Sequence, residues 1–311
     1  MEDELLARPL GVPTPGGSGI IILEEKIMEL KEVIGRRRSM RFLRPYKPVE
    51  REKIQKMLEA ARIASFWGNV QALDAVVIER ATAPQEVLDA LPTGTAIGGF
   101  QFRTAPVCII WYVNWDRIPK QDERLHELVD AGALGVNPEK SHEYLDEVLI
   151  PFFESAIEGI RDSGITECDC GQGIAQATLV AYEEGLGTCV LAGFISKKLK
   201  RVLEIPANGE IMLLQTVGYP MEDPDAGGQR PKLPFEQKFS LNKVGDPFPR
   251  SAAVVEELKA AKMLCDPAPL AYRREELQLL QGMYGLTEVF GDEIPGIIAA
   301  AEEEAKEEGS G

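Results

Sequence analysis

The stretch RRRSMRF, residues 36–42, places four arginines and a serine within seven positions of a chain whose formal net charge is −16. A planar guanidinium group matches the oxygens of a phosphate, and the serine hydroxyl adds a short hydrogen-bond donor. An apolar pattern of helical spacing precedes the stretch, and the chain-breaking residues Pro45 and Pro48 follow it. The stretch alone leaves two interpretations open: an anion-binding site, or cations that complement the dipole at a helix C-terminus.

The composition argues against several classes of function. The chain has 311 residues, a sequence pI of about 4.8 and a hydrophobic fraction of 44%. Such an acidic protein is a poor candidate for nonspecific nucleic-acid binding or for adsorption to an anionic membrane. The N-terminus lacks the pattern of a secretory signal, and the five cysteines are an odd number, so we expect a cytoplasmic protein with free thiols.

Sequence patterns divide the chain into three segments. Residues 1–24 are a Pro- and Gly-rich arm, residues 25–240 alternate helical and strand patterns, and residues 241–311 are helical and acidic. The apolar faces of residues 174–181 predict a buried central helix, whereas residues 116–140 read as polar and irregular. The order of elements indicates an α/β or α+β sandwich. The expected strands are 74–78, 105–113, 188–192 and 211–218, and the expected helices are 50–64, 85–91, 141–163, 169–184 and 196–203.

Segments within residues 25–240 resemble, in the same order, the FMN-dependent nitroreductase family. The segments that carry the resemblance are 37–42 (RRSMRF), 68–71 (GNVQ), 173–194, 217–220 (VGYP) and 230–234 (RPKLP). The resemblance implies an α+β fold, a three-layer sandwich with a mixed central sheet flanked by helices. A helical C-terminal extension would follow this FMN-binding domain.

The resemblance also implies which residues bind FMN. Side chains from two distant parts of the chain would hold the phosphate: Arg37, Arg38, Ser39, Arg41, Arg230 and Lys232. Asn69 and Gln71 would reach the flavin ring, because an amide can donate and accept at once. Ala192 and Gly193 would present a backbone N–H to flavin N5, which stabilises the reduced flavin. The alternative interpretations are a solvated loop at residues 230–232 and a plain turn after Ala192.

The GNVQ turn departs from the family on the side where a substrate would bind. Ala72 and Leu73 follow Gln71 where the family has Pro-Trp, and Phe66 and Trp67 precede Gly68 where the family has small residues. Two aromatic rings there would narrow a substrate pocket and offer a flat surface to a planar acceptor. The alternative is that Phe66 and Trp67 are only core packing.

The implied function is an oxidoreductase that passes electrons from NADH or NADPH through FMN to an electron-poor acceptor, aromatic, nitro or quinone-like, by a ping-pong mechanism. No side chain is assigned a catalytic role, since the cofactor carries the redox chemistry. The resemblance implies a homodimer with both flavins at the interface, and the C-terminal extension would wrap the partner or cover the pocket. The alternatives are reductive dehalogenation, another flavin redox reaction, or a noncatalytic flavin-binding protein.

Other candidate residues do not form a second site in the sequence. Cys168 and Cys170 are two residues apart, so they do not share a helix face, and no neighbouring motif completes a zinc site. The two histidines, His126 and His142, lie in a polar segment and indicate neither a metal site nor a catalytic triad. A cysteine at a helix start can be a reactive thiolate, although a buried inert thiol is more common.

Overall fold

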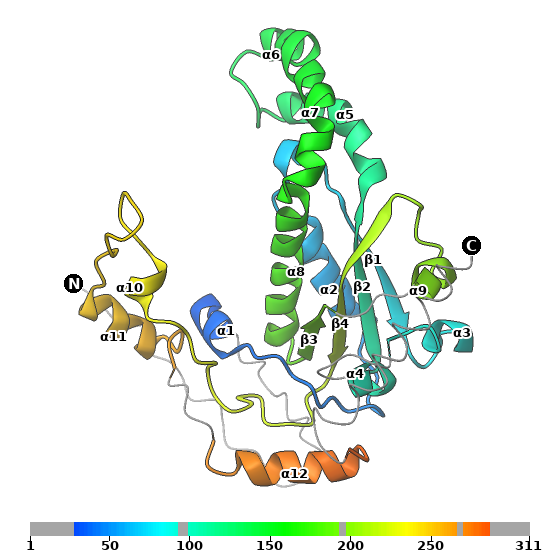
Figure 1. Cartoon of the computed structure of the whole chain (residues 1–311), viewed down its shortest axis with the longest axis vertical. Helices are drawn as coiled ribbons and strands as arrows, with labels where there is room; N and C mark the ends of the chain where they lie inside the picture. Colours follow the sequence, from blue (N-terminus) through cyan, green and yellow to red (C-terminus); the bar gives the residue numbers. More distant parts are fainter. Residues whose placement is uncertain (1–27, 93–98, 193–196, 266–269, 287–311) are drawn as a thin grey trace, which may run out of the picture.

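A computed structural model of the protein describes residues 28–92, 99–192, 197–265 and 270–286. Its centre is a four-stranded sheet in the spatial order β1-β2-β4-β3 (Figure 1). The strands are β1 Leu73–Glu79, β2 Val107–Asn114, β3 Gly187–Leu191 and β4 Gly209–Gly218. All three pairs of neighbouring strands are antiparallel. The parallel component of the expected mixed sheet is, among the described residues, one isolated bridge between Ser39 and Thr188.

Helices cover both faces of the sheet, which confirms the expected α+β sandwich of three layers. One face carries α2 (Arg51–Arg62) and α8 (Ile165–Glu183), and the other carries α3 (Gln85–Leu88), α4 (Gly99–Thr104) and α9 (Lys197–Val202). Successive side chains of a strand point to opposite faces. Ile109 of β2 therefore packs under α2 and α8, while Ile110 packs under α3 and α9.

The long helix α8 is buried on one side, whereas Ala175 and Gln176 are exposed, so the prediction of a buried central helix is only partly confirmed. Ala177 and Ala181 are 0% exposed and pack against the sheet together with Ala61 of α2. Gly173 is required for the close approach of the two helices, because a Cβ there would lie 3.0 Å from the carbonyl oxygen of Ala61. Small residues thus let α8 pack closely against both α2 and the sheet.

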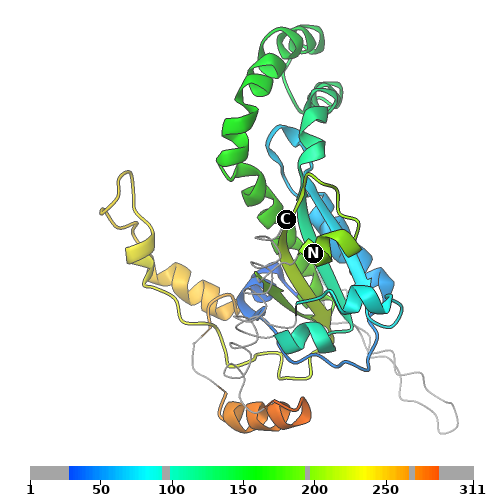
Figure 2. The same ribbon diagram turned by 45° about the vertical axis from the view of Figure 1, so that its right-hand side comes forward.

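A helical protrusion extends from the end of the sheet where β2 ends and β1 begins (Figures 1 and 2). Its elements are η2 Trp115–Lys120, α5 Gln121–Asp130, α6 Pro138–Tyr144, the π-helical turn η3 Leu145–Leu149, and α7 Ile150–Asp162. The prediction that residues 116–140 are irregular is wrong, because Leu125 and Val129 pack α5 against Leu145. The single helix predicted at 141–163 is interrupted by η3.

The remaining helices lie at the ends of the described chain. They are α1 Leu30–Arg36, α10 Phe235–Lys238, α11 Ala252–Ala260 and α12 Arg273–Met283. Helix α12 lies across the other end of the sheet from the protrusion (Figure 1), where Leu280 packs with Phe42 and Phe100. The expected N-terminal arm lies outside the described residues. None of the helices described is both long and apolar enough to span a bilayer.

Candidate functional site

The Arg-rich stretch, residues 36–42, runs beside β3 at the end of the sheet opposite the protrusion. Helix α1 ends at Arg36, and Ser39 then forms a bridge with Thr188. The backbone N–H of Met40 donates to the carbonyl oxygen of Thr188 at 2.9 Å. The Met40 side chain is 1% exposed, whereas Ser39 and Arg41 on either side of it are half-buried. Burial of Met40 in the core therefore fixes the two polar neighbours at the surface of the sheet's edge.

A buried carboxylate holds the backbone of this stretch. Oε1 of Glu222 accepts from the backbone N–H of Arg41 at 2.6 Å and from that of Phe42 at 3.1 Å. Its second oxygen, Oε2, accepts from Arg273 of α12 at 2.5 Å. Because the Glu222 side chain is 1% exposed, these charge-assisted bonds are shielded from water and fix the loop firmly.

Cations from distant parts of the sequence meet here, and we call Arg37, Arg41 and Arg230 the cation cluster. Burial and the like charges of Arg41, Arg38 and Arg273 lower the pKa of Arg230, although Glu222 partly offsets this effect. Burial and the charge of Arg38 likewise lower the pKa of Arg37.

The cation cluster still has free donors. Nε of Arg41 is buried without a hydrogen-bond partner, and the guanidinium group of Arg37 makes no hydrogen bond or ion pair with any described residue. A buried donor without a partner is costly, and neighbouring positive charges repel one another. An anion bound at the cluster would relieve both costs.

Two other predicted phosphate ligands have different surroundings. Arg38 is 5% exposed and donates to three backbone carbonyls, from Nε to Gly228 at 2.6 Å and from Nη1 to Gly35 and Arg37. Its guanidinium group therefore ties the Arg-rich stretch to the loop before Arg230. Lys232 is exposed and lies two residues beyond Arg230.

The GNVQ turn forms the short helix η1 (Trp67–Asn69) in strained backbone. Gly68, Asn69 and Gln71 all have positive φ values, of 49°, 53° and 49°. Asparagine tolerates this region, but glutamine adopts it rarely, so Gln71 is held there by its surroundings. Nε2 of Gln71 donates to Oδ1 of Asn69 at 3.3 Å. The turn thus presents two amide side chains as a pair.

Within one chain, the cation cluster and the amide pair lie at opposite ends of the sheet. The amide pair precedes Leu73, the first residue of β1. Ser39, beside the cation cluster, forms a bridge with Thr188, and across the sheet Thr188 is in register with Glu79, the last residue of β1. The row of paired residues that joins them is Thr188, Val217, Val107 and Glu79. Six steps of about 3.3 Å along β1 separate the two groups by about 20 Å. Ala192 follows β3 and is exposed, and Gly193 lies outside the described residues.

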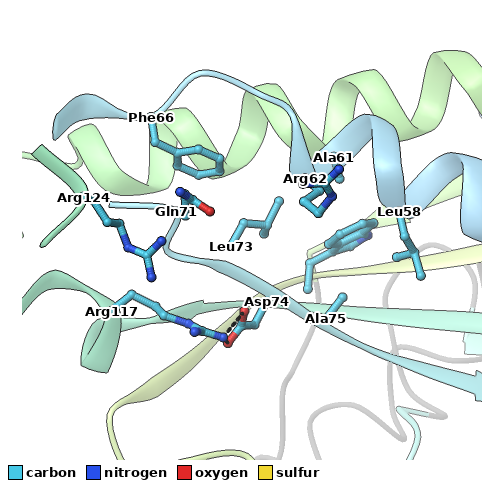
Figure 3. Close-up of a pocket in the computed structure, with 11 residues that line it drawn as sticks. Leu58, Ala61, Arg62, Phe66, Gln71, Leu73, Asp74, Ala75, Arg117 and Arg124 are labelled. Carbon is cyan, nitrogen blue, oxygen red and sulfur yellow. Dashed lines mark hydrogen bonds and ion pairs between the residues drawn. The ribbon is translucent and has the colours of Figure 1, made fainter. Parts of the chain in front are cut away.

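Gln71 of the amide pair borders a cavity of about 330 Å³ (Figure 3). Phe66 and Gln71 line it, together with Leu58, Ala61, Arg62, Leu73, Asp74, Ala75, Trp111, Arg117 and Arg124. Trp67 does not line this cavity. Its backbone N–H donates to Asp169 at 2.6 Å and its indole Nε1 to Thr166 at 3.0 Å, so it packs against α8. The two aromatic residues that the sequence grouped as a pocket thus have separate surroundings.

The buried cysteines are inert thiols. Burial, together with the charges of Glu167 and Asp169, raises the pKa of Cys170 to about 12, and burial raises that of Cys108 to about 12. Cys170 is also the sixth residue of α8 and not at its start, so the structure does not favour the reactive thiolate that a helix N-terminus could stabilise. Cys168 is exposed.

Four charged residues at these sites escaped sequence reasoning. They are Glu222 and Arg273 behind the Arg-rich stretch, and Arg117 and Arg124 at the cavity. Glu222 follows the VGYP segment by two residues, so its place at a strand end was a usable signal. The other three lie in segments with ordinary surface composition, and only tertiary packing brings them to the sites.

Comparisons with known proteins agree with this fold. The profile of the nitroreductase family matches residues 34–137 and 154–219, more than half of the chain. A curated relative, an NADH dehydrogenase from Thermus thermophilus, is 26% identical over 213 residues, which are 68% of this chain and 95% of the relative.

Solved structures share the fold at lower sequence identity. A nitroreductase family protein from Streptococcus pneumoniae has a TM-score of 0.55 and 21% identity, over 69% of this chain and all of the other. A nitroreductase from Exiguobacterium sibiricum in complex with FMN has a TM-score of 0.52 and 20% identity, over 67% and 94% of the two chains.

Proposed function

Because the chain belongs to the nitroreductase family, we propose that it is an FMN-dependent oxidoreductase that passes electrons from NADH or NADPH to an electron-poor acceptor. The curated relative is named an NADH dehydrogenase, and one structural relative was solved with FMN, which supports the donor and the cofactor. The proposed acceptors are aromatic, nitro or quinone-like compounds, reduced in a ping-pong sequence.

The cation cluster is the observation that carries this proposal. Arg41 offers a buried donor that has no partner, and burial together with its arginine neighbours lowers the pKa of Arg230. A dianionic phosphate would accept from both side chains and neutralise them. Ser39 and Arg37 would add donors, Lys232 would lie at the rim, and Arg38 would position the loop. When bound, FMN would supply the hydride-accepting ring and the two-electron chemistry.

The separation of the two groups supports a homodimeric site. In a dimer with two-fold symmetry, each subunit presents the same surface to its partner. The amide pair of one subunit can therefore lie next to the cation cluster of the other. We therefore propose that Asn69 and Gln71 contact the flavin ring held by the phosphate-binding residues of the partner subunit. The backbone after Ala192 is proposed to approach the same ring.

The proposal is tested first on the purified protein. We expect a yellow protein that releases FMN, and not FAD, on denaturation, since the cluster suits one terminal phosphate. We also expect steady oxidation of NADH or NADPH with a quinone or nitroarene as acceptor. A colourless protein that cannot be reconstituted with FMN would contradict the proposal.

A matched pair of variants then tests the cluster. Arg41→Gln removes a charge-assisted hydrogen bond, so FMN should bind roughly 10- to 100-fold more weakly. Arg44→Gln removes a cation from the same loop, but Arg44 is exposed and donates only to the carbonyl of Pro220. Its FMN affinity should match the wild type. Equal losses in both variants would show a general effect of charge and not a phosphate site.

A further inference from the structure

The cavity beside Phe66 is lined by more positively charged than negatively charged side chains. Three of its eleven lining residues are arginines, and Asp74 is the one acid among them. This is unusual in a chain with a formal net charge of −16. A local excess of one sign in a cleft attracts ligands of the opposite sign.

Two of the three arginines already have partners. Arg62 pairs with Glu59 at 2.6 Å on the exposed surface of α2. Arg117 donates from Nη2 to both oxygens of Asp74, at 3.1 and 3.2 Å. Asp74 also accepts from the side chain of Asn114 at 2.6 Å, so its carboxylate is committed to groups on the sheet side.

The third arginine has none. The side chain of Arg124, on α5, makes no ion pair or hydrogen bond with any residue that the structure describes. Its Nε is buried without a partner, and Nε of Arg117 in the same cavity is buried without one as well. Buried donors without acceptors are rare in folded proteins because they lose their hydrogen bonds to water. Because both arginines line one cavity, an anionic ligand there would offer their guanidinium groups the acceptors that the described residues do not supply.

The rest of the cavity wall defines the ligand's body. Arg117 and Arg124 lie on one side of the cavity, and Leu58 and Ala61 lie on the other (Figure 3). The Phe66 ring borders the same space and provides a flat apolar surface. A cavity of about 330 Å³ admits a small molecule but not a large one.

We propose that this cavity binds a small organic carboxylate with a flat apolar body. The carboxylate would lie between Arg117 and Arg124, because a guanidinium fork matches its two oxygens. The ring or chain of the ligand would pack against Phe66 and Leu58. This inference does not rest on the proposed redox function, since it uses only the residues that line the cavity.

Calorimetric titration of the purified protein with benzoate and with benzamide tests the site. The two probes share size and shape, but only benzoate carries a charge. Benzoate should bind on the order of tenfold more tightly than benzamide, since a hydrogen bond to a charged group is stronger than a neutral one. Arg124→Gln should reduce benzoate affinity to the level of benzamide and leave benzamide unchanged. No turnover is measured, and the flavin content of each sample is matched, because Gln71 lines this cavity and is also proposed to contact the flavin ring.

Two further variants complete the test. Lys120→Gln removes one positive charge from the same segment, but Lys120 is exposed and does not line the cavity, so the preference for benzoate should persist. Arg124→Lys keeps the charge and loses the fork, so it should retain part of the preference, and it replaces Arg124→Gln should that variant fail to fold. The proposal is overturned if neither probe binds, if both bind equally, or if the preference is unchanged in the Arg124 variants.

Discussion

Arg273 and Glu222 form an ion pair, 2.5 Å between Nη2 and Oε2, that joins helix α12 to the Arg-rich stretch. The other oxygen of Glu222 accepts from the backbone N–H of Arg41. A hydrogen bond from the Tyr284 hydroxyl to the carbonyl oxygen of Leu43 connects the same helix to the same loop. This part of the C-terminal extension therefore packs on its own chain. The expected contact of the extension with a partner subunit stays a prediction for α11.

Replacing Arg273 should destabilise the protein through Glu222. In Arg273→Ala the carboxylate stays buried without its cation, and the free energy of unfolding should fall by roughly 3 kcal/mol. We expect the lower end of the usual range because two backbone N–H groups still bond to Glu222. Urea unfolding measures the change.

Arg274→Ala is the matched control for this change. Arg274 is exposed on the same helix, so its loss should alter the stability by less than about 0.5 kcal/mol. FMN affinity should fall in Arg273→Ala only. Equal stability in the two variants would mean that the ion pair does not support the loop.

Phe66 and Trp67 should differ in what they do, although they are neighbours. Phe66→Ala removes a ring from the cavity wall, so kcat/KM for an aromatic acceptor should fall by up to about tenfold while the fold is kept. Trp67→Ala removes the hydrogen bond to Thr166 and the packing on α7, and should cost roughly 3 kcal/mol of stability. Stopped-flow measurement of the two half-reactions and thermal unfolding separate the effects. The same loss of stability in both variants would contradict a role of Phe66 in acceptor binding.

Thiol reactivity should follow burial. At pH 8, Ellman's reagent should modify Cys168 first and the partly exposed Cys265 more slowly, while Cys108, Cys170 and Cys189 react only after denaturation. Cys168→Ser should remove the fastest phase. Survival of that phase would mean that a buried thiol is accessible.

The raised thiol pKa values also predict loss of stability at alkaline pH. Cys108 and Cys170 stay protonated in the fold up to a pKa of about 12, whereas in the unfolded chain they ionise near pH 8.5. Their contribution to the free energy of unfolding is thus complete below about pH 8.5 and is lost as the pH rises towards 12. The free energy of unfolding, measured with urea across this range, should fall.

Local sequence patterns were sufficient for the elements of the sandwich. Residues 107–113 are apolar on both faces because β2 is a central strand with helices over each side. The small residues of α8 that pack on the sheet are buried, and their apolar character is visible without tertiary information. Patterns of this kind follow from burial, because the polarity of each residue matches its own burial.

The parts that were missed depend on contacts between distant residues. Helix α5 has the sequence QDERLHELVD, in which Leu125 and Val129 are the buried apolar residues. Both pack against Leu145 of η3, which follows α6. The sequence grouped Phe66 with Trp67, but Trp67 donates hydrogen bonds to Thr166 and Asp169 of α8 and so turns away from the cavity that Phe66 lines. Neither partner could be assigned from the turn itself.

A site shared between two subunits can be tested by complementation. We expect Arg41→Glu to abolish turnover through the cation cluster, and the double variant Asn69→Ala/Gln71→Ala to impair it strongly through the amide pair. If the chain forms the proposed homodimer, co-expression with two different tags should yield the heterodimer of these chains. One of its two sites combines the intact cluster of one chain with the intact amide pair of the other, so it should regain about half of the wild-type turnover.

A heterodimer of Arg41→Glu with Arg230→Glu is the control, because both changes fall in the cation cluster. Each of its two sites then contains one damaged cluster, so it should stay as inactive as the single variants. If every site were instead built from one chain, the Arg41→Glu and Asn69→Ala/Gln71→Ala pair would also stay inactive, since each chain would carry its own defect. Recovery in the first heterodimer and not in the second therefore requires the flavin ring and phosphate to be held by different subunits.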